Sequence, residues 1–148
     1  ENINSIAHAH PMYGKTFSTL GKTLDPISQD SCAFYERTAL FADYDGVANG
    51  PDEGINIAKA LGDKDFVILQ NHGILTTGTM VDTTIWYFLN MEDACKSQLL
   101  AEAVGKPIVI PHETACATLD YVANDLSAYV SFQPTVDVLW EEEPDLLD

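Results

Sequence analysis

Two of the four histidines in the sequence are separated by a single residue, in His8-Ala9-His10. The residues before them alternate loosely in polarity and Pro11 follows, which predicts a strand over residues 3–10 that runs into a loop. Residues two apart in a strand point to the same face, with Cα atoms ~6.6 Å apart at ~3.3 Å per residue. Two such imidazoles can converge on one divalent metal ion, although this spacing alone is also common among surface histidines.

A third histidine favours a metal site over the alternative of two surface histidines. The segment Asn71-His72-Gly73 separates two short apolar runs, residues 66–69 and 74–76, of which the first predicts a buried strand. The Gly permits a tight turn, and polar residues at strand ends often carry function. We therefore predict that the two histidines near the N-terminus and His72 bind one divalent metal ion. The alternative is a turn in which this histidine is incidental.

The remaining pattern mixes helices with strands, which favours a layered α/β domain. Residues 23–41 contain a turn at Asp25-Pro26 but give no clear assignment, and residues 43–50 are predicted to form a loop. The fourth histidine, His112, is interpreted as the N-terminal residue of a helix, with a structural role. Helices are predicted over residues 13–20, 52–61, 80–103 and 113–123, the first two closed by Gly21 and Gly62, and residues 136–147 form an acidic tail.

Composition excludes several classes of partner. The 148 residues suit one compact domain, and 46% hydrophobic against 20% charged residues is ordinary for a globular protein. A net charge of −16 disfavours nucleic acid and anionic membrane surfaces. The sequence has neither an apolar run of the ~20 residues that a membrane span needs nor a visible signal peptide. Three widely spaced cysteines without a CxxC motif indicate reduced thiols and a cytoplasmic location.

Longer ordered segments carry a family resemblance. Residues 8–47, 60–78 and 85–103 resemble the class II aldolase/adducin family, in which the HxH strand and the later Asn-His-Gly turn are the metal-ligand motifs. The segments LDPISQD, CAFYE and SFQP…EEEPDLLD resemble a subgroup of that family. The subgroup includes non-haem iron oxygenases/decarboxylases of aminocoumarin antibiotic pathways.

The resemblance implies a layered α/β/α domain with a central sheet flanked by helices, here residues 1–148 without the N-terminal part that usually supplies a fourth ligand, commonly a Glu. It implies a metal-dependent lyase acting on a small hydroxy- or keto-acid or sugar-like substrate, by aldol-type cleavage or decarboxylation. Two alternatives stay open: an Fe(II) oxygenase/decarboxylase, and a non-catalytic adducin-like module. Zn²⁺ is favoured as the metal over Fe²⁺, although imidazole accepts both. A homo-oligomer, a tetramer, is also expected.

Further residues are expected around the metal site. Tyr13 and Tyr35 are candidate catalytic proton donors, and Lys15 is a candidate to bind a substrate carboxylate. Gln29 and Asp30 are candidate hydrogen-bond partners of a ligand histidine, although Asp30 could instead cap a helix. For each of these residues, ordinary packing or surface exposure is the alternative. Residues 86–88, Trp-Tyr-Phe, are expected in the core or at a subunit interface.

Overall fold

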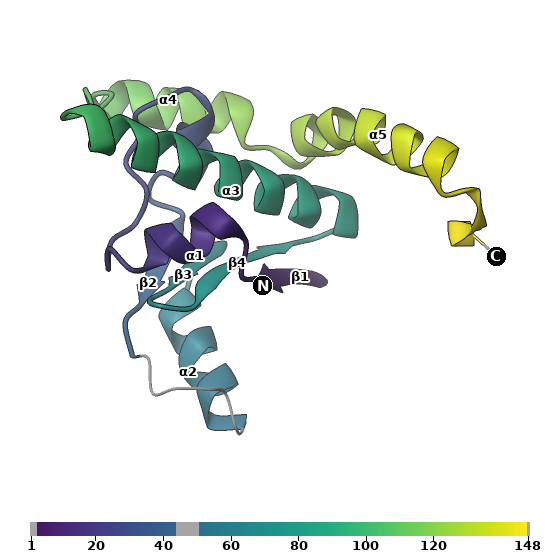
Figure 1. Ribbon diagram of the computed structural model, residues 1–148, viewed down its shortest axis with the longest axis horizontal. Coiled ribbons are helices and arrows are strands. Elements are labelled where there is room, and N and C mark those ends of the chain that lie inside the picture. Colours follow the sequence, from purple (N-terminus) through teal and green to yellow (C-terminus); the bar gives the residue numbers. More distant parts are fainter. Residues whose placement is uncertain (1–2, 44–50, 148) are drawn as a thin grey trace.

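A four-stranded sheet lies between helices in the computed structural model, which describes residues 3–43 and 51–147 (Figure 1). Both β1 (Ser5–Ala9) and β3 (Phe66–Leu69) pair antiparallel with β4 (Gly73–Gly78), whereas β2 (Thr38–Phe41) pairs parallel with β3. Of the predicted loop at residues 43–50, residue 43 lies outside any helix or strand, and residues 44–50 fall outside the described residues. In spatial order the strands are β1, β4, β3 and β2.

The helices form a layer on each side of the sheet, which confirms the expected architecture. Helices α1 (Met12–Ser18) and α3 (Val81–Val104) pack on one face, and α2 (Pro51–Leu61) packs on the other. Figure 1 shows α4 beyond α3, and α5 extending away from the sheet. The remaining elements are η1 (Asp30–Phe34), α4 (His112–Val122), α5 (Asp125–Glu142) and η2 (Pro144–Leu147).

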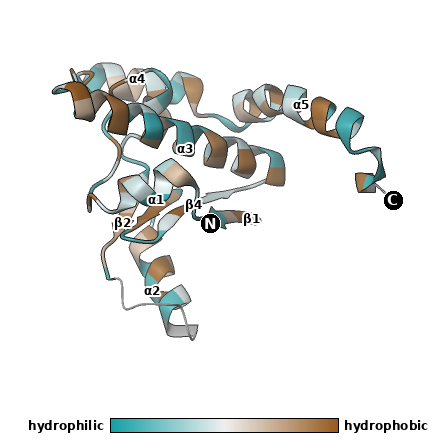
Figure 2. Cartoon of the chain, viewed as in Figure 1, coloured by the Kyte–Doolittle hydropathy of each residue, from teal (hydrophilic) through white to brown (hydrophobic). Residues whose placement is uncertain are grey.

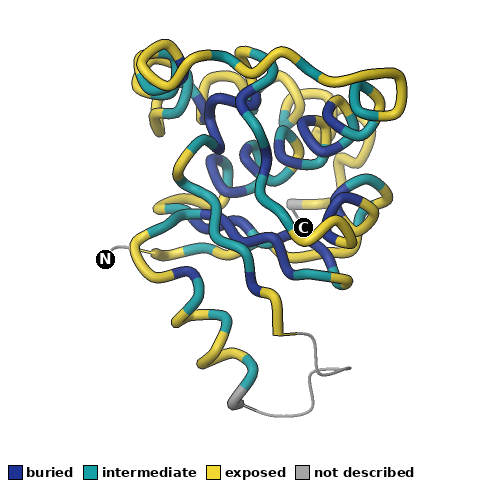
Figure 3. The backbone as a smooth tube through the Cα atoms, turned by 90° about the vertical axis from the view of Figure 1, so that its left-hand side faces the viewer, coloured by how far each residue is buried: buried dark blue, intermediate teal, exposed yellow. Residues whose placement is uncertain are grey.

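The core explains why the run at residues 66–69 is apolar at every position. Successive strand residues point to opposite faces, so Phe66 and Ile68 join the core under α3 while Val67 and Leu69 pack toward α2. Figure 3 shows this central strand buried. Because helices cover both faces of β3, side chains on both faces are shielded from water, and apolar residues are favoured at every position.

Helix α3 has a buried face and a solvent face. Figure 2 shows hydrophobic and hydrophilic residues alternating along the helix, and Leu89 and Leu100 are among its exposed apolar side chains. Its buried residues include Tyr87, Met91 and Cys95, at the spacing of four that aligns side chains on one face. Tyr87 is buried in the core, and the side chains of Trp86 and Phe88 are partly buried against the same cluster. Of the two alternatives for this aromatic segment, the structure therefore supports the core.

The C-terminal helix is the longest of the elements that the sequence did not reveal, which also include η1 and β2. Helix α5 begins after Asn124, whose side chain accepts a hydrogen bond from the backbone N–H of Ser127 as an N-cap. It continues through Pro134, which lacks the N–H of a helix hydrogen bond and argues locally against a helix. Among the described residues, no helix has the length and apolar character needed to cross a membrane.

Candidate metal centre

Three histidine rings meet beside the edge strand β1. The ring centroids of His8 and His10 are 5.1 Å apart, those of His8 and His72 are 5.0 Å apart, and those of His10 and His72 are 4.5 Å apart. One ring nitrogen of each residue lies within 4.8 Å of the other two. The first two side chains are exposed and His72 is half-buried. The structure thus brings together the three residues that the sequence singled out, and metal binding by them stays a prediction.

The three rings fit a divalent ion. With metal–nitrogen bonds of ~2.0–2.1 Å, neighbouring nitrogens in a tetrahedral site lie about 3.4 Å apart. The present separations, at most 4.8 Å, are within reach of small rotations of exposed side chains. Neutral imidazoles leave the ion its full charge and suit both Zn²⁺ and Fe²⁺. The donor set therefore does not by itself distinguish the two metals.

The strand pairing fixes the tautomer of His8. This residue lies opposite Leu75 in the pairing of β1 with β4. Its Nδ1 atom is 3.0 Å from the carbonyl oxygen of Ile74. Because a carbonyl oxygen only accepts hydrogen bonds, Nδ1 must carry the proton, and Nε2 keeps the lone pair that a metal ion needs.

A tight turn between β3 and β4 carries His72. Asn71 adopts a φ of 58°, in the left-handed region that Asn tolerates better than most residues. The backbone N–H of His72 then donates to the carbonyl of Leu69 at 3.0 Å. Burial lowers the pKa of His72, and its two histidine neighbours lower it further, whereas Glu53 raises it. The surroundings therefore favour the neutral, metal-binding form.

Gly73 allows the turn to approach the end of β1. A Cβ atom at this position would lie 2.5 Å from the carbonyl oxygen of Ala9 and 3.1 Å from Cδ2 of His10. Real Cβ atoms do not approach a backbone oxygen this closely, so only Gly permits the contact. The sequence indicated that Gly73 permits a tight turn. The close approach of Gly73 to the end of β1 is visible only in the fold.

A carboxylate from α3 fixes the start of α1, which follows His10 almost directly. One oxygen of Glu92 accepts from the backbone N–H of Tyr13 at 2.9 Å, and the other accepts from that of Gly14 at 2.5 Å. The first N–H groups of a helix have no partner within the helix, and negative charge is favourable at that end. Glu92 therefore holds the segment that carries one candidate ligand, a role that the helical pattern of α3 did not indicate.

We expect Glu92→Gln to lower the free energy of unfolding by about 1–3 kcal/mol, because hydrogen bonds to a charged acceptor contribute that much. The amide has one acceptor oxygen where the carboxylate has two. Metal affinity should fall as well, since the segment after β1 loses an anchor. Urea unfolding and metal titration measure the two effects. Asp93→Asn, the same change at an exposed neighbour, is the matched control; equal losses in both variants would contradict the anchor.

The other expected site residues lie in three places. Tyr13 and Lys15 belong to α1, in agreement with the helix predicted over residues 13–20. The Tyr13 ring packs against the core, with the Nζ atom of Lys96 5.3 Å from its centroid. Lys15 is exposed. Their positions follow the ligand-bearing segment closely in sequence, and their catalytic and substrate-binding roles stay predictions.

Tyr35 has its contacts elsewhere. Its hydroxyl lies 3.0 Å from Nδ1 of His112, the first residue of α4, and the two rings are 5.8 Å apart. The position of His112 at a helix start confirms that part of the sequence interpretation. The contacts that the structure gives Tyr35 thus do not support its expected place at the rim of the histidine site.

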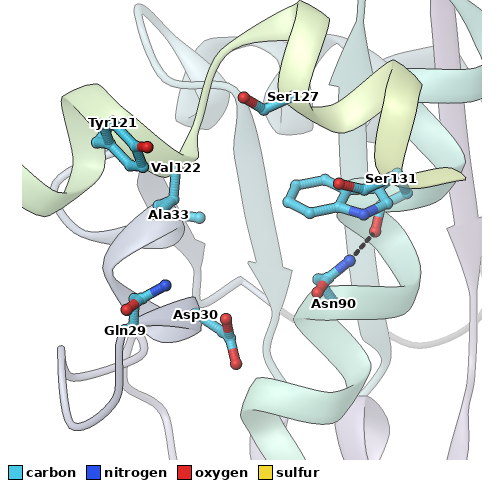
Figure 4. Close-up of a pocket in the computed structure, with 9 residues that line it drawn as sticks. Gln29, Asp30, Ala33, Asn90, Tyr121, Val122, Ser127 and Ser131 are labelled. Atoms are coloured by element: carbon cyan, nitrogen blue, oxygen red, sulfur yellow. Dashed lines mark hydrogen bonds between the residues drawn. The ribbon is translucent and has the colours of Figure 1, made fainter.

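Gln29 and Asp30 also lie apart from the histidines. Figure 4 shows both at a cavity of about 240 Å³, whose other lining residues come from η1, α3 and the two C-terminal helices. Asp30 is the first residue of η1, which has no side-chain cap. None of the three clustered histidines lines this cavity, and the expectation that the two residues orient a ligand histidine stays a prediction. The remaining lining residues are Ala33, Trp86, Asn90, Tyr121, Val122, Ser127 and Ser131.

Comparisons with known proteins identify relatives of this chain. The sequence is 36% identical over 145 residues to "Decarboxylase NovR" of Streptomyces niveus, covering 98% of this chain and 54% of that protein. It is 35% identical over 145 residues to a "4-hydroxy-3-prenylphenylpyruvate oxygenase/4-hydroxy-3-prenylbenzoate synthase" of Streptomyces roseochromogenus subsp. oscitans. This match covers 98% of this chain and 52% of that protein. The chain spans about half the length of these curated relatives.

A solved structure shares the fold. The L-fuculose 1-phosphate aldolase from Glaciozyma antarctica superimposes with a TM-score of 0.88 and 38% identity, covering 97% of this chain and 54% of that one. All three similar proteins are named as enzymes. The family model of the class II aldolase and adducin N-terminal domain matches residues 1–99, which include all three clustered histidines. The chain therefore belongs to the class II aldolase and adducin N-terminal domain family.

Proposed function

We propose that the intact protein is a metal-dependent oxygenase/decarboxylase that shortens a small 2-hydroxy- or 2-keto-acid by one carbon. The observation that carries the proposal is the convergence of His8, His10 and His72, with rings 4.5–5.1 Å apart. Two similar proteins, named as a decarboxylase and as an oxygenase, support this reading over simple aldol cleavage. The preferred metal in this proposal is Fe²⁺, because a reaction with O₂ needs a redox-active ion.

The overall reaction balances with one O₂ for either acid. A 2-keto-acid R–CH₂–CO–COO⁻ and O₂ give CO₂ and the shorter 2-hydroxy-acid R–CH(OH)–COO⁻, and a 2-hydroxy-acid reacts as follows. One O₂ accepts the four electrons released when R–CH(OH)–COO⁻ becomes R–COO⁻, CO₂ and water. The bond between the carboxylate carbon and the carbinol carbon breaks, and the carboxylate leaves as CO₂. The metal would supply Lewis acidity at the substrate oxygen atoms and would activate O₂.

The chain's own residues would orient the substrate. His8 is held by the Ile74 carbonyl with Nε2 free, so one ligand is preorganised. Lys15 is exposed on α1, close in sequence to the ligand His10, and forms no ion pair within the described part of the chain. In this proposal Lys15 binds the substrate carboxylate, and the Tyr13 hydroxyl donates a proton.

Two other functions have specific support. Aldol-type cleavage of a sugar-like substrate, with Zn²⁺, is favoured by the likeness to a fuculose phosphate aldolase. A non-catalytic adducin-like module is favoured by the family model, whose description includes adducin. The clustered histidines count against the module, because a scaffold has no use for three convergent ligands.

The test uses the intact protein, loaded with Fe²⁺ or with Zn²⁺, with and without O₂. Substrates are a series of 2-hydroxy- and 2-keto-acids and a series of phosphorylated aldol sugars. We expect CO₂ release from the acids only with Fe²⁺ and O₂. Cleavage of the sugars with Zn²⁺ and no need for O₂ would replace the proposal with an aldolase. No turnover of either series with either metal would leave the adducin-like module.

A further inference from the structure

A second group of metal-ligating side chains lies at the start of α4 and shares no residue with the three clustered histidines. His112 is the first residue of α4, and Cys116 follows one turn later on the same face of the helix. Glu36 reaches them from the turn between η1 and β2. The sequence pattern indicates a structural role for His112 and does not connect these three residues, because 76 positions separate Glu36 from His112.

The three side chains lie almost as close together as the ligands of a metal site. Nδ1 of His112 lies 3.6 Å from a carboxylate oxygen of Glu36. Both ring nitrogens of His112 lie 3.8 Å from the sulfur of Cys116. One ligand atom from each residue lies within 4.8 Å of the others. Nitrogen, sulfur and oxygen ligands around a tetrahedral Zn²⁺ lie about 3.3–3.6 Å apart, so the required movement is a few tenths of an ångström for the closer pairs.

Packing holds these side chains together. Helix α4 packs against η1, with Ala115 fully buried between the two ligand positions on α4. The Tyr35 hydroxyl, 3.0 Å from Nδ1 of His112, restrains the imidazole ring, and an ion that binds Nδ1 would displace this contact. Cys116 forms no disulfide. The group is open to solvent, since 63% of the His112 side chain and 59% of the Glu36 side chain are exposed.

From this arrangement we infer that Glu36, His112 and Cys116 form a second metal site, selective for a thiophilic divalent ion such as Zn²⁺. A thiolate with an imidazole selects zinc and similar transition metals over Mg²⁺ and Ca²⁺, which prefer oxygen ligands. Three protein ligands leave a fourth position for water. The ion would tie α4 to the turn before β2, and through it to the sheet.

Cobalt distinguishes the two sites, because only this one contains a thiolate. Titrating the intact protein with Co²⁺ should give a thiolate-to-cobalt charge-transfer band in the near ultraviolet. Zn²⁺ should displace the cobalt and remove the band, whereas Mg²⁺ should not. The Cys116→Ser variant should lose the band and one equivalent of bound metal per chain, and His112→Ala should do the same.

His8→Ala is the matched control, because it removes a histidine from the other site. This variant should keep the band, so failure of the proposed function leaves this result unaffected. Cys32 and Cys95 are buried, and Cys32→Ser should likewise keep the band. A protein without the band, or a Cys116→Ser variant that retains it, would overturn the second site.

Discussion

Replacing His10 with Ala is expected to lower the affinity for a divalent metal ion by more than about 100-fold, since loss even of a supporting hydrogen bond to a metal ligand costs 10–100-fold. Activity that depends on the ion should fall with it. His10 is exposed and lies one residue beyond β1, so the core does not depend on its side chain. The free energy of unfolding of the metal-free protein should change by less than about 0.5 kcal/mol, as for ordinary surface substitutions.

Metal analysis and isothermal titration measure the first effect, and circular dichroism during urea unfolding measures the second. The titration is best made in a Cys116→Ser background, so that a metal ion at the second site does not mask the loss. Met12→Ala removes another exposed side chain two residues away and should bind metal normally. If His10→Ala lost metal and secondary structure together, the histidine site would be structural and not catalytic.

The second large effect concerns Gly73. The Gly73→Ala variant places a methyl group 2.5 Å from the Ala9 carbonyl oxygen, so the backbone of β1 or β4 must move. Overpacking of this kind costs about 1–3 kcal/mol of stability. Because the same methyl group would lie 3.1 Å from His10, the ligand geometry should change as well, with weaker metal binding. Few single methyl groups elsewhere in the chain are expected to affect both fold and site.

Gly105→Ala is the matched control. Gly105 follows α3 with an extended φ of 172°, and an added Cβ meets nothing within 4 Å. This variant should unfold and bind metal like the parent protein. A Gly73→Ala protein of unchanged stability and metal affinity would show that β1 and the turn before β4 can separate freely, against the close approach seen in the fold.

The homo-oligomer implied by the family resemblance stays a prediction. The surface first suggested for it, Trp86 to Phe88, packs largely into the protomer's own core. Exposed apolar side chains are instead frequent along the C-terminal helix α5, among them Leu126, Val130 and Trp140. Light scattering of the intact protein measures the assembly directly.

Local sequence patterns predict several strands and helices of this protein and the three clustered histidines. Strand alternation, the buried run at residues 66–69 and helical spacing along α3 are local signals, because each depends on neighbours within a few residues. The HxH spacing and the Asn-His-Gly turn are equally local. These features explain why the α/β fold and the group His8, His10 and His72 were predictable.

Which distant residues support that site, and which make their contacts elsewhere, depends on how the chain packs in three dimensions. Glu92 meets the start of α1 across 78 positions, and Gly73 meets Ala9 across the β1–β4 pairing, contacts to which no local pattern points. Tyr35 was expected beside the histidines because its sequence neighbourhood follows theirs. The fold places its hydroxyl against His112, since packing of η1 on α4 is set by burial of apolar surface and not by chain order.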